Sequence, residues 1–116
     1  MTQITNGNTR IVDQLVIAYN AHNARAFADF FSEGALHGVL HSETQQRGSE
    51  EIYRRYLQFF SDFPANHTIV VHRIAFGEFV VDHERVRRSP QSEPFNVVAI
   101  HEFEGGLIKR LDFIKE

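Results

Sequence analysis

Three ionisable residues, Asp82, His83 and Glu84, close a segment (residues 77–84) that otherwise has the apolar composition of a buried β-strand. Moving a charged carboxylate or imidazole out of water costs several kcal/mol of free energy unless the group is paired or neutralised. The three side chains therefore form either an ion-paired ladder or the polar wall of a pocket. Because side chains alternate along a strand, Asp82 and Glu84 share one face of it and His83 takes the other.

His101 supplies a second imidazole on the next predicted strand. If it faces inward, so do Val97, Ala99 and Phe103, a set typical of a cavity wall. His83 and His101 are equally distant from position 92, inside the loop between the strands, so a symmetric hairpin would place them on one face about 5 Å apart. Two imidazoles so placed could move a proton across a bound carbonyl group. A structural or interface role for each histidine is the alternative.

Other motifs that carry chemistry do not occur in the sequence. Of its seven histidines, His37 and His41 fall in an extended or loop segment, and no cysteine or paired acid completes a known ligand set. There is no glycine-rich phosphate loop and no nucleophile elbow. We therefore predict no metal and no cofactor.

Composition limits the class of protein. With 116 residues, 42% of them hydrophobic, we expect one domain over residues 1–116. The absence of cysteine fits a reducing compartment, and we expect a cytoplasmic protein. No apolar run approaches the roughly 20 residues that span a bilayer, and a net charge of −3 offers no surplus for phosphate. Neither a membrane nor a nucleic acid is an expected partner.

The hydrophobic period changes once along the chain. Apolar residues recur at helical spacing in the first half, which predicts helices over residues 9–21, around 27–31 and over 49–63, with a short strand at 35–40. After Pro64 the period is two, which predicts strands over residues 67–76, 79–88, 95–104 and 107–115. Helices followed by an antiparallel meander indicate an α+β fold with three helices over one face of a curved sheet.

This order of elements resembles the nuclear transport factor 2-like fold, in particular its ketosteroid-isomerase and polyketide-cyclase-like (SnoaL-like) branch. The resemblance covers residues 9–115, and its carriers are residues 19–23, Phe30 and Phe31, Arg47 and Gly48 with Ile52 and Tyr56, and residues 105–108. It implies a cone-shaped sheet around a deep apolar pocket, with the outer sheet face forming a dimer. Members include isomerases, dehydratases, cyclases, epoxide hydrolases and non-catalytic binding proteins, so the fold does not fix the reaction.

Carried over residue by residue, the resemblance implies losses as well as matches. The tyrosine donor of the ketosteroid isomerases falls on Leu15 and their aspartate base on Val39. Their second oxyanion acid falls on His101, a pocket-lining aromatic on His83, and an accessory tyrosine on Tyr56. The apolar pocket would remain, with two histidines and a phenol.

We therefore expect binding of a small apolar or polycyclic molecule, with isomerase-, cyclase- or dehydratase-like acid–base chemistry by His83 and His101. A non-catalytic ligand-binding or assembly module is the alternative. We expect the ligand to contact a set of aromatic and apolar side chains: Tyr19, Tyr56, Val39, Val97, Ala99 and Phe103. In the predicted strand over residues 95–104, the face opposite His101 carries Val98, Ile100 and Glu102, and we expect this face to form the homodimer interface.

Ketosteroid isomerisation by this chain should be negligible, because Val39 cannot abstract a proton and Leu15 cannot donate a hydrogen bond. The absorbance of the conjugated enone product measures it directly. Robust turnover would show that the alignment is shifted or that a histidine replaces the lost aspartate.

Overall fold

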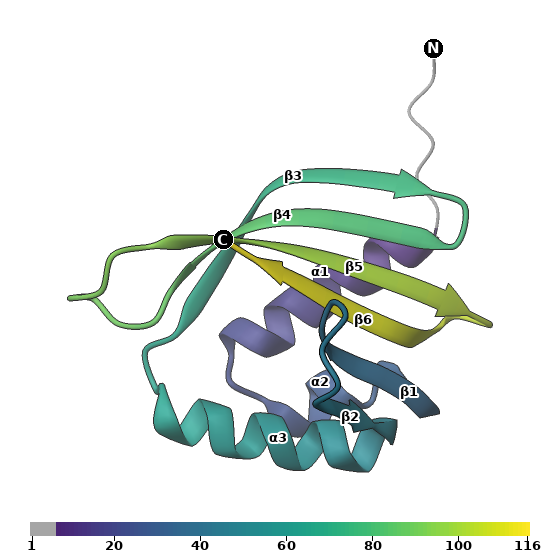
Figure 1. Ribbon diagram of the computed structural model, residues 1–116, viewed down its shortest axis with the longest axis horizontal. Coiled ribbons are helices and arrows are strands. Elements are labelled where there is room, and N and C mark those ends of the chain that lie inside the picture. The colour runs from purple at the N-terminus through teal and green to yellow at the C-terminus, as the bar shows by residue number, and fades with distance from the viewer. Residues whose placement is uncertain (1–6) are drawn as a thin grey trace.

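A computed structural model describes residues 7–116, in which three helices lie against a six-stranded curved sheet (Figure 1). The α+β fold expected from the sequence is confirmed. The elements are α1 (Gly7–Asn20), α2 (Ala24–Ala28), β1 (Phe31–Val39), β2 (Gln45–Arg47), α3 (Gly48–Asp62), β3 (His67–Phe76), β4 (Phe79–Arg87), β5 (Phe95–Glu104) and β6 (Leu107–Lys115). Within residues 7–116, no helix combines the length and apolar character that crossing a membrane requires.

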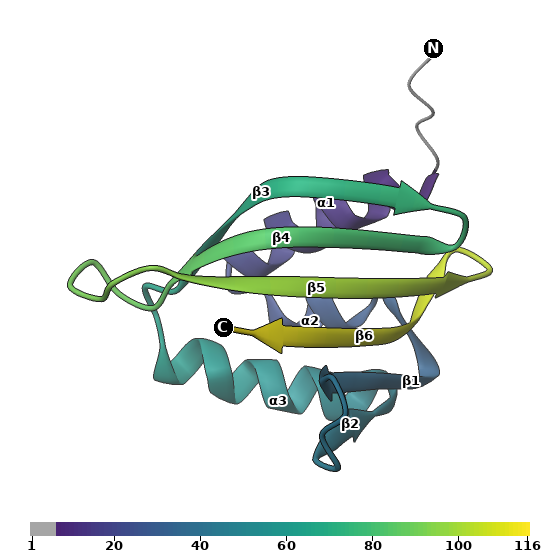
Figure 2. The same cartoon turned by 45° about the horizontal axis from the view of Figure 1, so that its top comes forward.

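The sheet has the order β2-β1-β6-β5-β4-β3, and its strands lie side by side with the helices behind them (Figure 2). Every neighbouring pair is antiparallel except β1 and β6, which run parallel. The helices cover only the inner face of the sheet. Among residues 7–116, no helix lies on the other wide side of the sheet.

The first half of the chain contains more strand than its sequence predicts, and its second helix lies earlier in the chain. The second helix ends at Ala28, and β1 begins at Phe31. Phe27 and Phe31 still meet in the core, with ring centroids 5.4 Å apart, but from the end of a helix and the start of a strand. Between the predicted strand and the predicted third helix, residues 45–47 also form β2, which pairs with β1. Gly48 then opens α3 at a φ of +86°, where a Cβ would lie 2.5 Å from the Glu33 carbonyl oxygen.

The hydrophobic core lies between the inner sheet face and the helices. The helices contribute apolar residues at intervals of three or four, and the strands contribute alternate residues. Val12, Leu15 and Ala18 of α1, Ile52, Tyr56, Phe59 and Phe60 of α3, and Val97, Ala99 and Phe103 of β5 are buried. The inward orientation predicted for the His101 face of β5 is confirmed.

The predicted pairing of His83 with His101 is wrong. In the β4–β5 hairpin, His83 pairs with Val98 and His101 pairs with Val80. The cause is an asymmetric connection: a turn closes between Ser89 and Ser92, and the remaining loop residues all precede β5. This turn centres the hairpin between positions 90 and 91 instead of at 92, an odd shift that sends the two imidazoles to opposite faces.

The outer face of the sheet carries many apolar side chains. Ile74 is 66% and Phe76 80% exposed, and the face also includes Val81, Val98, Ile100 and Ile114. Contiguous apolar patches of this kind are typical of protein–protein interfaces. A second copy of the chain is the occupant we expect, through a twofold contact.

Ile74→Lys should shift the protein from dimer to monomer, because the new charge would be buried at the interface. Sedimentation at micromolar concentration measures the change. Leu57→Lys on α3, at a similarly exposed position away from this face, is the matched control and should leave the dimer intact. A monomeric wild type would contradict the expectation.

Candidate functional site

A cavity of about 480 Å³ lies between the inner face of the sheet and helices α1 and α3. Much of its wall is apolar, including Leu15, Val39, Phe59, Val97, Leu111 and Phe113. The polar groups on the wall include His37, Gln46, Tyr56, Thr68, Glu84 and His101. A mainly apolar cavity with a few convergent polar groups is the usual form of a small-molecule site.

Five of the expected site residues line this cavity: Tyr19, Val39, Tyr56, Val97 and His101. Ala99 and Phe103 share the inner face of β5 but lie in the packed core, each 1% exposed. The contacts expected for these two with a ligand have no basis in the cavity geometry.

His83 lies on the outer face of the sheet, away from the cavity. Its ring stacks on that of His72 with centroids 5.7 Å apart, and its Nε2 is 2.9 Å from Oδ1 of Asn96. The predicted acid–base pair of His83 and His101 therefore does not form, because the hairpin register sends their side chains to opposite faces.

His101 is buried beside the cavity in one defined tautomer. Its Nδ1 is 2.8 Å from the Val80 carbonyl oxygen, which can only accept, so Nδ1 carries the proton and donates. In the neutral ring, Nε2 is then an acceptor. Burial lowers the pKa of His101, which keeps the imidazole neutral at pH 7.

Tyr56 and His37 form a hydrogen-bonded pair that also lines the cavity. The Tyr56 hydroxyl is 2.6 Å from His37 Nε2, and His37 Nδ1 is 2.8 Å from Gln46 Oε1. Burial lowers the pKa of His37 to about 4 and raises that of Tyr56 well above its usual value, so both groups are neutral at pH 7.

The direction of this hydrogen-bond chain is set by the Gln46 amide. With Oε1 toward His37, Nδ1–H donates to Gln46 and the Tyr56 hydroxyl donates to Nε2. A half-turn of the amide presents its NH₂ group and reverses both bonds, since neutral histidine has two tautomers. The Tyr56 proton is then free to point into the cavity. The Tyr56–His37 pair can thus offer a ligand either a hydrogen-bond acceptor or a hydrogen-bond donor.

Glu84 is a buried carboxyl on the cavity wall. Its pKa is raised to about 7, first by burial and then by the negative charge of Asp82. Thr68 Oγ1 lies 3.2 Å from Glu84 Oε1 and 3.3 Å from the Arg85 carbonyl oxygen. One hydroxyl proton cannot serve both acceptors, but a protonated Glu84 can donate to Thr68 while Thr68 donates to Arg85. The neutral acid satisfies the whole network.

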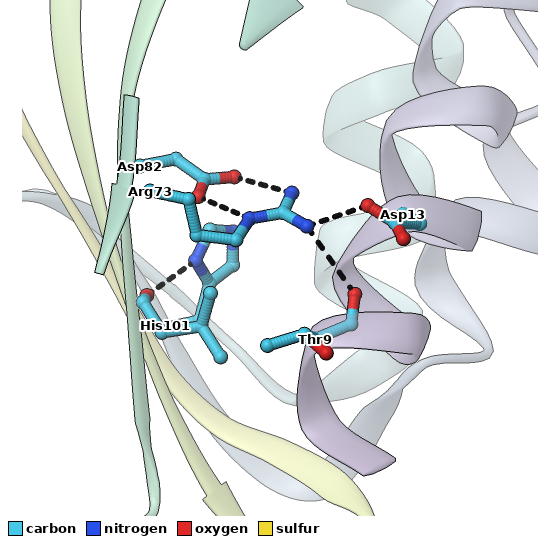
Figure 3. A network of polar contacts seen from close by, with 6 residues as sticks. Thr9, Asp13, Arg73, Asp82 and His101 are labelled. Atoms are coloured by element: carbon cyan, nitrogen blue, oxygen red, sulfur yellow. Dashed lines mark hydrogen bonds and ion pairs between the residues drawn. The ribbon is translucent and has the colours of Figure 1, made fainter. Parts of the chain in front are cut away.

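Asp82 is fully buried and is held by Arg73 of β3 (Figure 3). The guanidinium donates from Nε to Oδ1 at 2.7 Å and from Nη2 to Oδ2 at 3.0 Å. It also reaches α1, where it contacts Asp13 and the Thr9 carbonyl oxygen. Of the two alternatives that the sequence left open, an ion-paired ladder and a polar pocket wall, Asp82 follows the first through Arg73 and Glu84 follows the second.

Asp82, Glu84 and His101 form a cluster in which potential ligand atoms lie within 4.8 Å of one another. Both oxygens of Asp82 already accept hydrogen bonds from Arg73. The guanidinium of Arg73 therefore supplies the positive charge that these acids attract. The chemical effect of the cluster is on Glu84, whose pKa is raised in part by the negative charge of Asp82.

The sequence did not identify His37, Gln46 and Thr68 as site residues, and it left Glu84 between an ion pair and a pocket wall. A signal for Glu84 was present, because Val80 and Val86 flank the acids on their face of β4 whereas Arg85 and Arg87 lie on the other. No signal identified His37 or Gln46, which meet only because β2 pairs with β1.

Glu84→Gln should raise the free energy of unfolding at pH 8 by up to about 3 kcal/mol. The folded-state pKa is raised, so the neutral carboxyl stabilises the fold below pH 4.5 and this contribution is lost as the pH rises through about 7. Urea unfolding of both proteins between pH 4 and pH 8 measures the difference. Glu93→Gln, at an exposed loop position, is the control. A difference that is flat with pH would contradict a raised pKa.

Comparison with known proteins places this geometry in a family. The model of the SnoaL-like domain matches residues 12–111. Among curated proteins, none matches the chain. A solved structure of an uncharacterised cystatin-fold protein from Novosphingobium aromaticivorans is similar at 26% identity and a TM-score of 0.87, over 96% of this chain and 100% of that one.

Two further solved structures share the fold at lower identity. A SnoaL-like protein of unknown function from Burkholderia thailandensis is 15% identical with a TM-score of 0.81, over 98% of this chain and 99% of that one. A protein with a ketosteroid isomerase-like fold from Catenulispora acidiphila, in complex with trimethylamine, is 14% identical with a TM-score of 0.80, over 91% of this chain and 85% of that one. The fold, the cavity and the match over residues 12–111 agree: the chain belongs to the SnoaL-like domain family.

Proposed function

We propose that this protein binds a small, largely apolar carbonyl compound in its cavity and moves a proton on it, as an isomerase, cyclase or dehydratase does. One observation carries the proposal: a carboxyl group with a pKa near 7 lies on the wall of an apolar cavity of about 480 Å³. The most effective acid–base catalysts have a pKa close to the working pH.

Glu84 is the proton carrier in this reaction. Its carboxylate takes a proton from the carbon next to the ligand carbonyl, the C–H electron pair forms a carbon–carbon double bond, and the carbonyl oxygen becomes an enolate oxygen. The neutral Glu84 then returns the proton to another carbon of the same enolate. Atoms and charge balance without a cofactor.

Tyr56 is the hydrogen-bond donor to the enolate oxygen. It has this role when the Gln46 amide directs its NH₂ group to His37, so that His37 donates to the Tyr56 oxygen and the Tyr56 proton points into the cavity. The high pKa of the buried phenol keeps that proton in place. A donor placed where charge develops stabilises the transition state directly.

A non-catalytic binding role is the alternative. It is favoured by Leu15 and Val39, which both line the cavity and occupy the positions that the resemblance assigns to a donor and a base. Glu84 and Tyr56 would then serve only to hold a polar group of the ligand.

Proton abstraction can be tested with β-tetralone, an aromatic ketone with acidic protons next to its carbonyl. In deuterium oxide, NMR should show enzyme-dependent loss of these signals, with a rate that rises through about pH 7 as Glu84 ionises. Glu84→Gln should reduce the rate by about 100-fold or more, the scale of general base catalysis. Glu93→Gln should have the wild-type rate. If the ketone binds without faster exchange, the binding role is the better description.

A further inference from the structure

Three cationic side chains gather at the opening of the cavity. Arg55 of α3, Arg88 just after β4 and Lys115 at the end of β6 all line it, and all three are exposed or half-buried. The ends of β4 and β6 lie at the same end of the sheet, with α3 running below them (Figure 2). Within residues 7–116, none of the ion pairs includes any of the three.

Aromatic rings and one amide hold Arg88 in place. Its guanidinium lies 4.8 Å from the ring centre of Phe95 and 4.9 Å from that of Phe59, and it donates to Asn66 Oδ1 at 2.7 Å. These contacts fix the orientation of the cation but leave its charge uncompensated. The Arg55 guanidinium lies 6.0 Å from the Phe59 ring centre.

The positive charges act on one another. The pKa of Lys115 is lowered by burial and by the nearby charges of Arg88 and Arg55. Among the described residues that line the cavity, Glu84 is the only acid, and with its pKa raised to about 7 roughly half of its carboxyl groups are neutral at that pH. Glu116, which follows Lys115 in the chain, accepts a hydrogen bond from Asn96 and, within residues 7–116, forms no ion pair with any of the three cations. Like charges without a counter-charge favour the binding of an anion.

We infer that the ligand is an anion: an apolar body that fills the cavity, with a compact anionic head group held at the opening by Arg55, Arg88 and Lys115. A carboxylate or a phosphate suits these donors, because guanidinium groups bind both in a bidentate manner. The inference rests on the proposed function, since the same cavity holds the carbonyl near Tyr56 and Glu84. It narrows the ligand class to an apolar carbonyl acid or its phosphate counterpart.

Three naphthalene probes that differ only in the head group test the inference. Naphthoate and naphthyl phosphate carry the anion, and naphthamide is the neutral match. Calorimetry at low ionic strength should show at least one anion binding about tenfold or more tightly than the amide, the scale of charge-assisted hydrogen bonds. The stronger anion identifies the head group. Raising NaCl from about 0.02 to about 0.5 M should weaken the anions and leave the amide unchanged.

Single charge removals test the assignment to residues. Arg55→Gln and Lys115→Gln should each reduce the anion preference by about two- to fivefold, and the double variant should remove most of it. Lys115→Arg should retain the preference. Arg54→Gln removes the same charge from the neighbouring exposed position of α3, which does not line the cavity, and should have no effect.

The failure of this inference is distinguishable from failure of the proposed function. Equal affinity for all three probes would overturn the anionic ligand class, while binding in the cavity would stand. An anion preference reduced as much by Arg54→Gln as by Arg55→Gln would overturn the assigned site. If no probe binds, both the anionic ligand and the cavity as a binding site for such molecules are overturned. Loss of proton exchange alone in Glu84→Gln bears only on the chemistry.

Discussion

The buried charge of Asp82 is the constraint on which much of this molecule depends. Its side chain is fully buried, and an isolated carboxylate there would be too costly to keep ionised. Arg73 compensates it through two hydrogen bonds and extends the same guanidinium to α1. The interaction therefore orients α1 over the sheet. It also sets the chemistry nearby, because the charge of Asp82 helps to raise the pKa of Glu84.

The interior and the opening of the cavity are electrostatically different. Its interior holds His37, Tyr56 and His101, which burial keeps neutral, and Glu84, which titrates near pH 7. Its opening holds cations that have no acidic partner among the described residues. Charge at the opening orients a ligand, and in the proposed reaction a single negative charge inside the cavity passes from Glu84 to the enolate and back. The two environments come from different elements that only the fold brings together.

Local patterns in the sequence predicted most of the scaffold. The change of period after Pro64 located all four long strands, and alternation correctly placed His101 on the inner face of β5. The predictions that failed depended on strand register and strand pairing, which local patterns do not determine. An asymmetric loop shifted the hairpin register and moved His83 to the outer face, and pairing of β1 with β2 created the contact between His37 and Gln46. A one-residue uncertainty in a turn changes no strand, but it reverses which side chains reach the site.

The ion pair that holds α1 to the sheet has a consequence for how such a protein can diversify. Asp13, Arg73 and Asp82 do not line the cavity, whereas Leu15, Val39, Tyr56 and Glu84 do. The interaction that secures the architecture and the residues that meet a ligand are thus separate sets of positions. Substitutions among the cavity-lining residues can accumulate over generations without disturbing the ion pairs of Arg73 with Asp13 and Asp82. A lineage built this way can exchange one reaction for another, or lose catalysis, while inheriting the same scaffold.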